Sequence, residues 1–214
     1  MNRRSFLKIA GLTATSALMS PTATLAATTG WVDNWWKEED EADGQQLPDM
    51  VKPAGAERLG QYCQGTLRLR SSIHGEAYEF RFRDTAGNYD QQVLASLHWF
   101  LRCRDGSWQH MDVRAIESLN YLSALLGVPE IQINSAYRSP SYNAKLSRGN
   151  ENVARNSLHM YGRALDINIP GIPIREICSY ALYARDTIGY GGIGYYPKAN
   201  FVHMDSGPVK NWVK

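Results

Sequence analysis

One stretch of the chain, Ser157 to Ile169 with the sequence SLHMYGRALDINI, constrains the fold more than any other. His159 and Asp166 lie seven residues apart in it, with the turn-permissive Gly162 between them. After the glycine, apolar and polar residues alternate, and this period of two predicts a β-strand. The stretch therefore predicts a turn followed by a strand that holds its carboxylate on the face opposite the apolar side chains.

A second strand-like segment, Phe201 to Asp205, offers another histidine and another carboxylate. His203 and Asp205 are two residues apart, so on a strand both side chains point to the same face. Catalytic zinc typically takes three protein ligands and keeps a fourth position open for water. The sequence therefore offers His159, Asp166 and His203 as a candidate Zn²⁺ site.

Such a site needs a group that moves protons. A metal ion would lower the pKa of a bound water to near neutrality, and a nearby carboxylate would take the proton and return it to a leaving amine. Position 200, three residues before His203, could hold such a base, but it is Asn200. Asp205 is therefore the candidate catalytic base, and orienting His203 is its rival role.

A simpler interpretation stays open on these residues alone. A lone histidine is more often a satisfied polar residue than a ligand, and a His and an Asp seven apart arise easily by chance. This spacing is also less diagnostic than HExxH. The pattern by itself leaves a metal site and an ordinary polar cluster as alternatives.

The remainder of the chain predicts a mixed scaffold of helices and short strands. Alternating residues over 65–70 and 76–83, joined by a turn, predict a β-hairpin. Helix starts are predicted at Asp90, Asp112, Ser139 and Pro173, each of which precedes a helical pattern. Because no regular βαβ rhythm is visible, we expect an α+β fold in which a small antiparallel sheet carries the zinc site and helices flank it.

The N-terminus has the features of an export signal over residues 1–27. A twin arginine, Arg3-Arg4, precedes a weakly apolar run and then small residues where a signal peptidase could cut. The pair resembles the twin-arginine signal, whose pathway carries folded proteins across the bacterial inner membrane. The apolar run is shorter than the ~20 residues of a membrane span. We therefore expect a periplasmic or cell-envelope protein with no stable membrane span after cleavage.

The length and the formal charge of the chain after such cleavage limit its domain count and its partners. Removing residues 1 to 26 leaves 188 of 214 residues, enough for one domain. The formal charge of +2 becomes −1, because Arg3, Arg4 and Lys8 leave with the signal. No net positive charge remains that would attract nucleic acid. Residues 28–56 are acidic, contain tryptophans and predict a linker, so we place the domain at 57–214 and expect a monomer.

The chain has three cysteines, Cys63, Cys103 and Cys178. An odd count allows at most one internal disulfide, and Cys63 with Cys103 is the only pair we consider. Cys178 lies within the helix predicted to start at Pro173, so we expect a buried free thiol there.

Four separated motifs resemble those of one enzyme family. They are Ser157-Leu-His159, Gly162-Arg-Ala-Leu-Asp166, Phe201-Val-His-Met-Asp205, and Ala136-Tyr-Arg-Ser-Pro140 with Asn143. Together they are similar to the D-Ala-D-Ala-peptidase-like zinc metallopeptidases, a fold group that includes lysostaphin and hedgehog-like domains. The closing segment 201–209 with Trp212 most resembles the murein endopeptidase K type of that group.

The resemblance implies Zn²⁺ bound by His159, Asp166 and His203, and cleavage of peptide cross-links of peptidoglycan at bonds involving D-centres. It also suggests that Arg138 binds a substrate carboxylate or the developing oxyanion, which suits a guanidinium fork. Tyr137 belongs to the same segment and is a candidate substrate-binding residue. Ser157 is another, although capping a turn is its alternative role.

Three functions remain after this comparison of motifs. The first is a zinc endopeptidase that cuts peptidoglycan cross-links. The second is a carboxypeptidase of the same chemistry, which trims a terminal D-residue. The third is a wall-binding module without catalysis, against which the complete ligand set argues.

Overall fold

The computed structural model describes residues 65–128, 130–150 and 153–214. The predicted signal 1–27 and linker 28–56 lie outside the described residues. The N-terminal boundary of the predicted domain 57–214 also lies outside them, so these boundaries stay predictions. The strands are β1 (Thr66–Ser71), β2 (Ala77–Arg81), β3 (Ile131–Ser135), β4 (Ala164–Asn168), β5 (Gly192–Tyr196), β6 (Phe201–Asp205) and β7 (Lys210–Val213). The helices are α2 (Gln91–Phe100), α3 (Val113–Leu126), α4 (Pro140–Gly149), the 3₁₀ helix η2 (Leu158–Tyr161) and α5 (Ile174–Ile188).

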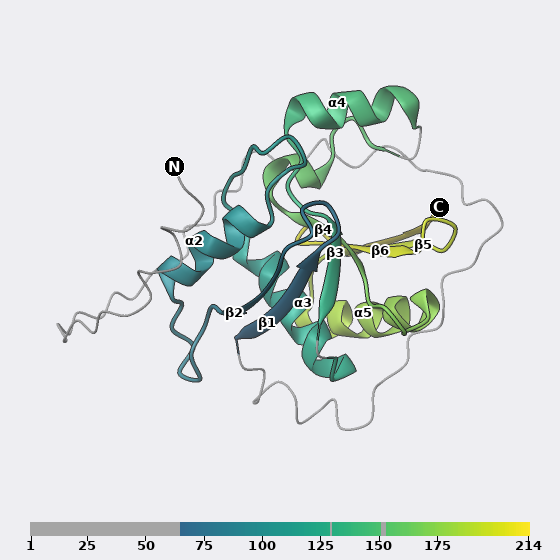
Figure 1. Ribbon diagram of the computed structural model, residues 1–214. Coiled ribbons are helices and arrows are strands. Elements are labelled where there is room, and N and C mark those ends of the chain that lie inside the picture. The colour runs from purple at the N-terminus through teal and green to yellow at the C-terminus, as the bar shows by residue number, and fades with distance from the viewer. Residues whose placement is uncertain (1–64, 129, 151–152) are drawn as a thin grey trace. The chain divides into compact units, whose positions relative to one another are not determined.

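The strands form one sheet in the order β2-β1-β3-β4-β6-β5-β7 (Figure 1). The pairs β1–β3 and β5–β7 are parallel, and the other neighbouring pairs are antiparallel. The predicted α+β class is confirmed, but the sheet is seven-stranded and mixed, where we expected a small antiparallel one. The reason is that α2 and α3 lie between β1 and β3 in the chain and allow the crossover that a parallel pair needs.

One face of the sheet is apolar and packs in the core, and the other face carries polar side chains. In β4, Leu165 and Ile167 lie in the main hydrophobic core and alternate with Asp166. In β6, Val202 belongs to the same core and alternates with His203. Helices α3 and α5 pack together and contact this apolar side, whereas α4 lies on the opposite side from α5 (Figure 1). Burial of one large apolar side chain contributes ~1.5–3 kcal/mol to folding. Burial of the apolar residues in β4 and β6 therefore determines that Asp166 and His203 lie on the opposite face of the sheet.

The four predicted helix starts are confirmed, and three of them have side-chain caps. The Asp90 carboxylate accepts from the backbone N–H groups of Gln92 and Val93 at the start of α2. The side chains of Asp112 and Ser139 cap α3 and α4 in the same way. Each such cap contributes about 1 kcal/mol. Pro173 precedes α5 without a side-chain cap, as a residue with no polar side chain must.

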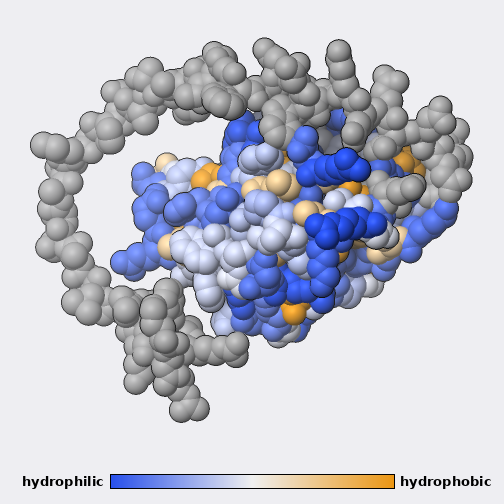
Figure 2. Space-filling view, turned by 90° about the horizontal axis from the view of Figure 1, so that it is seen from above, coloured by the Kyte–Doolittle hydropathy of each residue, from blue (hydrophilic) through white to orange (hydrophobic). Residues whose placement is uncertain are grey.

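Hydrophilic residues cover most of the described surface in the view of Figure 2, and hydrophobic ones gather in small separate groups. Cys103 and Cys178 are buried free thiols, whereas Cys63 lies outside the described residues. Burial raises the pKa of the Cys178 thiol to about 12, so this predicted free thiol is inert at neutral pH. Among the described residues, no helix combines the length and the apolar character that crossing a membrane requires.

Candidate metal centre

Two of the three predicted ligands are neighbours across the sheet. Asp166 of β4 and His203 of β6 face each other in antiparallel register, so their side chains leave the same face of the sheet. His159 comes from η2, the short helix that precedes β4. This helix ends at Gly162, whose φ of 64° is left-handed and lets the chain turn directly into the strand. The sequence separation of seven is therefore one turn of helix, a reversal and the start of a strand.

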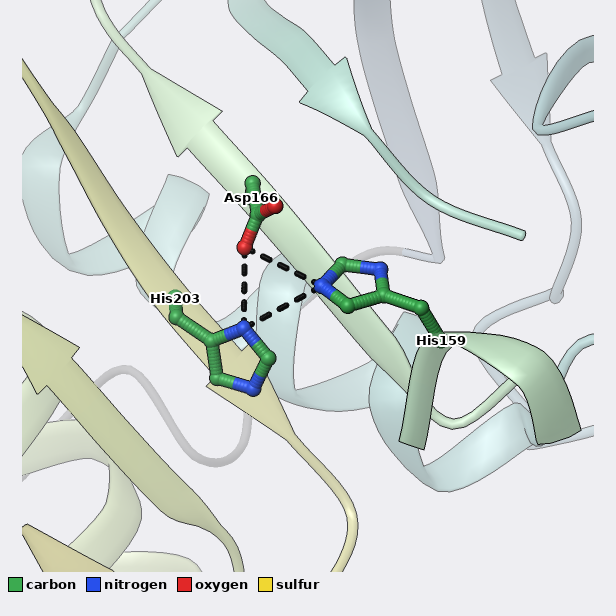
Figure 3. Close-up of side chains that lie close together, drawn as sticks. All are labelled: His159, Asp166 and His203. Atoms are coloured by element: carbon green, nitrogen blue, oxygen red, sulfur yellow. Dashed lines mark hydrogen bonds and ion pairs between the residues drawn. The ribbon is translucent and has the colours of Figure 1, made fainter. Parts of the chain in front are cut away.

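The three side chains converge on one point (Figure 3). Asp166 Oδ1 lies 2.8 Å from His203 Nδ1 and 3.1 Å from His159 Nε2, and the two histidine nitrogens are 3.2 Å apart. All three residues are buried. One atom from each lies within 4.8 Å of the others, an arrangement that could hold a metal ion. The structure thus brings together the whole predicted ligand set.

The outer nitrogen of each imidazole has its own acceptor. Nδ1 of His159 lies 2.6 Å from the carbonyl oxygen of Ala136, which can only accept, so Nδ1 carries the proton and Nε2 keeps its lone pair. Nε2 of His203 lies 3.3 Å from Oδ2 of Asp205, which favours Nδ1 as the other free lone pair. Two lone pairs and a carboxylate oxygen then face one another. Such a donor set fits a cation, because without one the inner atoms must share a proton.

The charge states of His159 and Asp166 agree with this interpretation, whereas His203 would have to release a proton to an incoming ion. Burial is the largest influence on His159 and, with the nearby Arg138 charge, lowers its pKa to about 4. Burial also disfavours charge on His203, but its bonds to Asp166 and Asp205 outweigh that and raise its pKa to about 9. Burial would raise the pKa of Asp166, yet its interactions with His159, Arg138 and His203 hold that pKa well below its usual range. Asp166 is therefore ionised at neutral pH, which is the protonation state that a metal ligand needs.

Arg138 contacts the centre from the side of β3. One guanidinium nitrogen, Nη2, pairs with Oδ2 of Asp166, the oxygen that faces away from the histidines. Its Nε donates to Ser135 Oγ at 2.8 Å, and its backbone N–H donates to the His159 carbonyl at 3.1 Å. Arg138 thus holds Asp166 with one oxygen toward the histidines. The predicted contact with substrate stays a prediction.

Asp205, the predicted base, lies behind His203. Its Oδ2 faces Nε2 of that histidine, and its Oδ1 accepts from the backbone N–H groups of Gly192 at 2.8 Å and Gly207 at 2.7 Å. Burial opposes its charge, but these bonds lower its pKa. A carboxylate with both oxygens engaged and a lowered pKa is well suited to orienting a ligand and poorly suited to collecting protons. Of the two roles that the sequence left open, the geometry favours orientation.

Ser157 and Tyr137 have structural contacts. Ser157 Oγ accepts from the backbone N–H of His159 and caps η2, which is the alternative role given for it. Tyr137 is buried in the main core, and its backbone N–H donates to the Leu101 carbonyl. Through its cap, Ser157 helps to place His159. The predicted contacts of Ser157 and Tyr137 with substrate stay predictions.

The sequence did not reveal the backbone partners of the centre. The Ala136 carbonyl that fixes His159 has no signature, because every residue carries a carbonyl group. Gly192 had a weak signal, since a glycine inside a strand often marks a close approach. A Cβ on Gly192 would lie 2.5 Å from Oδ2 of Asp205, so the glycine makes room for that carboxylate.

Comparison with known families decides the relationship. A family model described as peptidoglycan L,D-endopeptidase MepK matches residues 63–212. The chain belongs to this family. The peptidoglycan L,D-endopeptidase MepK of Escherichia coli strain K12 is 38% identical over 148 residues, which cover 68% of this chain and 79% of that protein. The probable peptidoglycan L,D-endopeptidase MepK of Haemophilus influenzae is 34% identical over 149 residues, or 68% and 77% of the two chains. No solved structure matches.

The MepK family membership confirms the resemblance inferred from the four motifs. It also confirms the expectation of a peptidase of the murein endopeptidase type. The matched range contains every residue of the candidate centre, so the family relationship and the geometry concern the same part of the chain. The carboxypeptidase and the wall-binding module are not favoured.

Proposed function

We propose that this protein is a zinc-dependent endopeptidase that hydrolyses peptide cross-links of peptidoglycan. The observation that carries the proposal is the buried convergence of His159, Asp166 and His203 in a chain that belongs to a family of peptidoglycan endopeptidases. Two imidazoles and a carboxylate are a ligand set of catalytic zinc, which leaves a position for water or substrate. Bound zinc would supply a Lewis acid at that position and lower the pKa of water there.

The protein's own groups would prepare the ligands for this chemistry. The Ala136 carbonyl and the Asp205 carboxylate each hold an outer imidazole N–H, so that Nε2 of His159 and Nδ1 of His203 present lone pairs to the ion. Arg138 holds the outer oxygen of Asp166. Because these partners are buried and fixed, little reorganisation is required when the ion binds or when charge develops on a substrate.

We propose a second task for Arg138, which is to stabilise negative charge on the substrate. Its Nη2 and Nε atoms are engaged by Asp166 and Ser135, so a substrate oxygen would approach Nη1 at the outer edge of the guanidinium. The Arg138 side chain as a whole is 13% exposed, so it is not fully closed off from a substrate. A cation beside the reacting carbonyl would contribute through the developing oxyanion.

We propose that the bond cut joins an L-centre to a D-centre. The relatives in Escherichia coli and Haemophilus influenzae are named for L,D-endopeptidase activity. In peptidoglycan, a 3–3 cross-link joins an L-centre to a D-centre, whereas a 4–3 cross-link joins two D-centres. We therefore expect 3–3 cross-links to be cut in preference.

We further propose that residues 1–27 direct export by the twin-arginine pathway, that 28–56 form a linker, and that a monomeric domain 57–214 acts in the periplasm. The order of twin arginine, apolar run and small residues supports export. A substrate in the cell wall agrees with that location.

The deciding experiment measures metal and products together. The purified mature protein should hold about one zinc per chain by elemental analysis and release monomers from 3–3 cross-linked muropeptides, identified by mass. His159→Ala and Asp166→Ala should each lose the zinc and the release. Trp108→Ala changes a half-exposed aromatic outside the ligand set and should keep both. If the two ligand variants cut normally, the active site lies elsewhere.

A further inference from the structure

A single row of residues crosses five strands on the face that carries the candidate ligands. In register, Ser135 of β3 faces Asp166 of β4, which faces His203 of β6. His203 faces Gly194 of β5, and Gly194 faces Trp212 of β7. Side chains at such positions share one face of the sheet. Because Gly194 has no side chain, the row has a gap between the imidazole of His203 and the indole of Trp212.

The indole of Trp212 fills that gap. A Cβ added to Gly194 would lie 2.6 Å from both Cε2 and Nε1 of Trp212, far inside normal contact distance. The ring of Trp212 therefore lies directly over the Gly194 backbone. It reaches His203, with ring centroids 5.2 Å apart and the planes inclined by 52°. A glycine in the middle of a strand is thus explained by an aromatic ring that covers it.

Further contacts hold the indole in this place. Nε1 of Trp212 donates to the Tyr196 hydroxyl at 2.9 Å. Tyr196 stacks on Phe201, with ring centroids 4.3 Å apart and planes inclined by only 17°. The far edge of the indole borders Gly192, where an added Cβ would lie 3.0 Å from Cζ3. The ring therefore has little freedom to tilt away from His203.

We infer that Trp212 is a positioning residue for His203, and that Gly194 is required because it leaves room for the indole. Asp166 and Asp205 hold the imidazole through its two nitrogens. Trp212 packs against the ring and adds a further restraint on its rotation about the Cβ–Cγ bond. The inference rests on the proposed function where it concerns the metal, because an imidazole free to rotate would bind zinc less tightly.

The test compares variants by metal binding without substrate. Trp212→Ala should weaken zinc binding about 10-fold, measured by competition with a chromophoric chelator, and should change the visible absorption spectrum of the Co²⁺-substituted protein. Trp108→Ala removes another indole, one that contacts Trp99 and His110 instead, and should change neither. Thermal unfolding of each variant shows that the fold persists.

A double-mutant cycle tests the role of Gly194. Gly194→Ala alone should weaken zinc binding, because the methyl group displaces the indole; its backbone has no positive φ that would add strain. In the Trp212→Ala background the same change should have little further effect, because the obstructing ring is gone. Additive effects of the two changes would contradict the inference.

Two results separate this inference from the proposed function. If Trp212→Ala raises KM and leaves zinc affinity and the Co²⁺ spectrum unchanged, Trp212 contacts substrate and the positioning role is wrong. If the wild-type protein binds no zinc, the proposed function fails instead. In that case the ring resonances of His203 still decide the inference in the metal-free protein, where Trp212→Ala should broaden them through ring motion and Trp108→Ala should not.

Discussion

The Asp205→Asn substitution gives the sharpest test of how the centre is built. In the structure, Oδ1 of Asp205 accepts two backbone N–H groups, from Gly192 and Gly207, and Oδ2 faces Nε2 of His203. An asparagine has one acceptor oxygen and one NH₂ donor. Its oxygen would take the two backbone N–H groups, because an NH₂ placed there would oppose two donors. The NH₂ would then point at Nε2 of His203.

The consequence falls on the other nitrogen of the imidazole. Nε2 of His203 would become an acceptor, and the proton would move to Nδ1, where it bonds to Asp166 Oδ1 at 2.8 Å. A protonated Nδ1 cannot bind a metal ion. Groups that orient metal ligands typically contribute 10–100-fold in affinity. Because the tautomer itself is reversed here, we expect zinc binding to weaken by about 100-fold, which corresponds to about 2.7 kcal/mol.

The assay is zinc competition with a chelator, followed by muropeptide cleavage at saturating zinc. Asp84→Asn is the matched control, because the Asp84 carboxylate also accepts two backbone N–H groups, from Ala86 at 2.9 Å and Asn88 at 2.8 Å, in the loop after β2. That variant should bind zinc normally. If Asp205→Asn keeps normal zinc affinity and loses only turnover, Asp205 is the catalytic base and the orientation argument is refuted.

Two further predictions concern the scaffold around the centre. Ser157→Ala removes the cap of η2 and should lower the free energy of unfolding by about 1 kcal/mol, measured by urea denaturation; a loss of substrate affinity at unchanged stability would instead indicate a substrate contact. Burial, and to a lesser extent the nearby His110, lowers the pKa of His98 to about 4, and its Nδ1 accepts from the Met111 backbone N–H. Between pH 6.5 and 4 the unfolded chain therefore binds the proton that the folded protein excludes, so the His98 contribution is present above about pH 6.5 and is lost as the pH falls. His98→Gln should make thermal stability less dependent on pH over this range, and an unchanged pH dependence would contradict the argument.

The strands and caps were predictable because their signals are local. The alternation around Asp166 follows from the period of a strand, and the same rule placed His203 and Asp205 on one face. The caps at Asp90 and Asp112 follow from the unpaired N–H groups of a helix start. Each of these depends on residues a few positions apart.

The partners across the sheet were not predictable in this way. Nothing in the period of a strand says that β1 pairs with β3 in parallel, or that β5 lies between β6 and β7. For the same reason the sequence left two roles open for Asp205. Its position behind His203 depends on the backbone N–H groups of Gly192 and Gly207, which the fold brings together.

The sequence by itself determined which side chains were available to bind a metal and which face of its own strand each occupied, because backbone geometry fixes that locally. Only the tertiary structure decided how they are held. The Ala136 carbonyl reaches His159, and the indole of Trp212 reaches His203 across Gly194, through pairings between segments distant in the chain. These pairings depend on burial of the whole apolar face of the sheet, which no short stretch of sequence specifies.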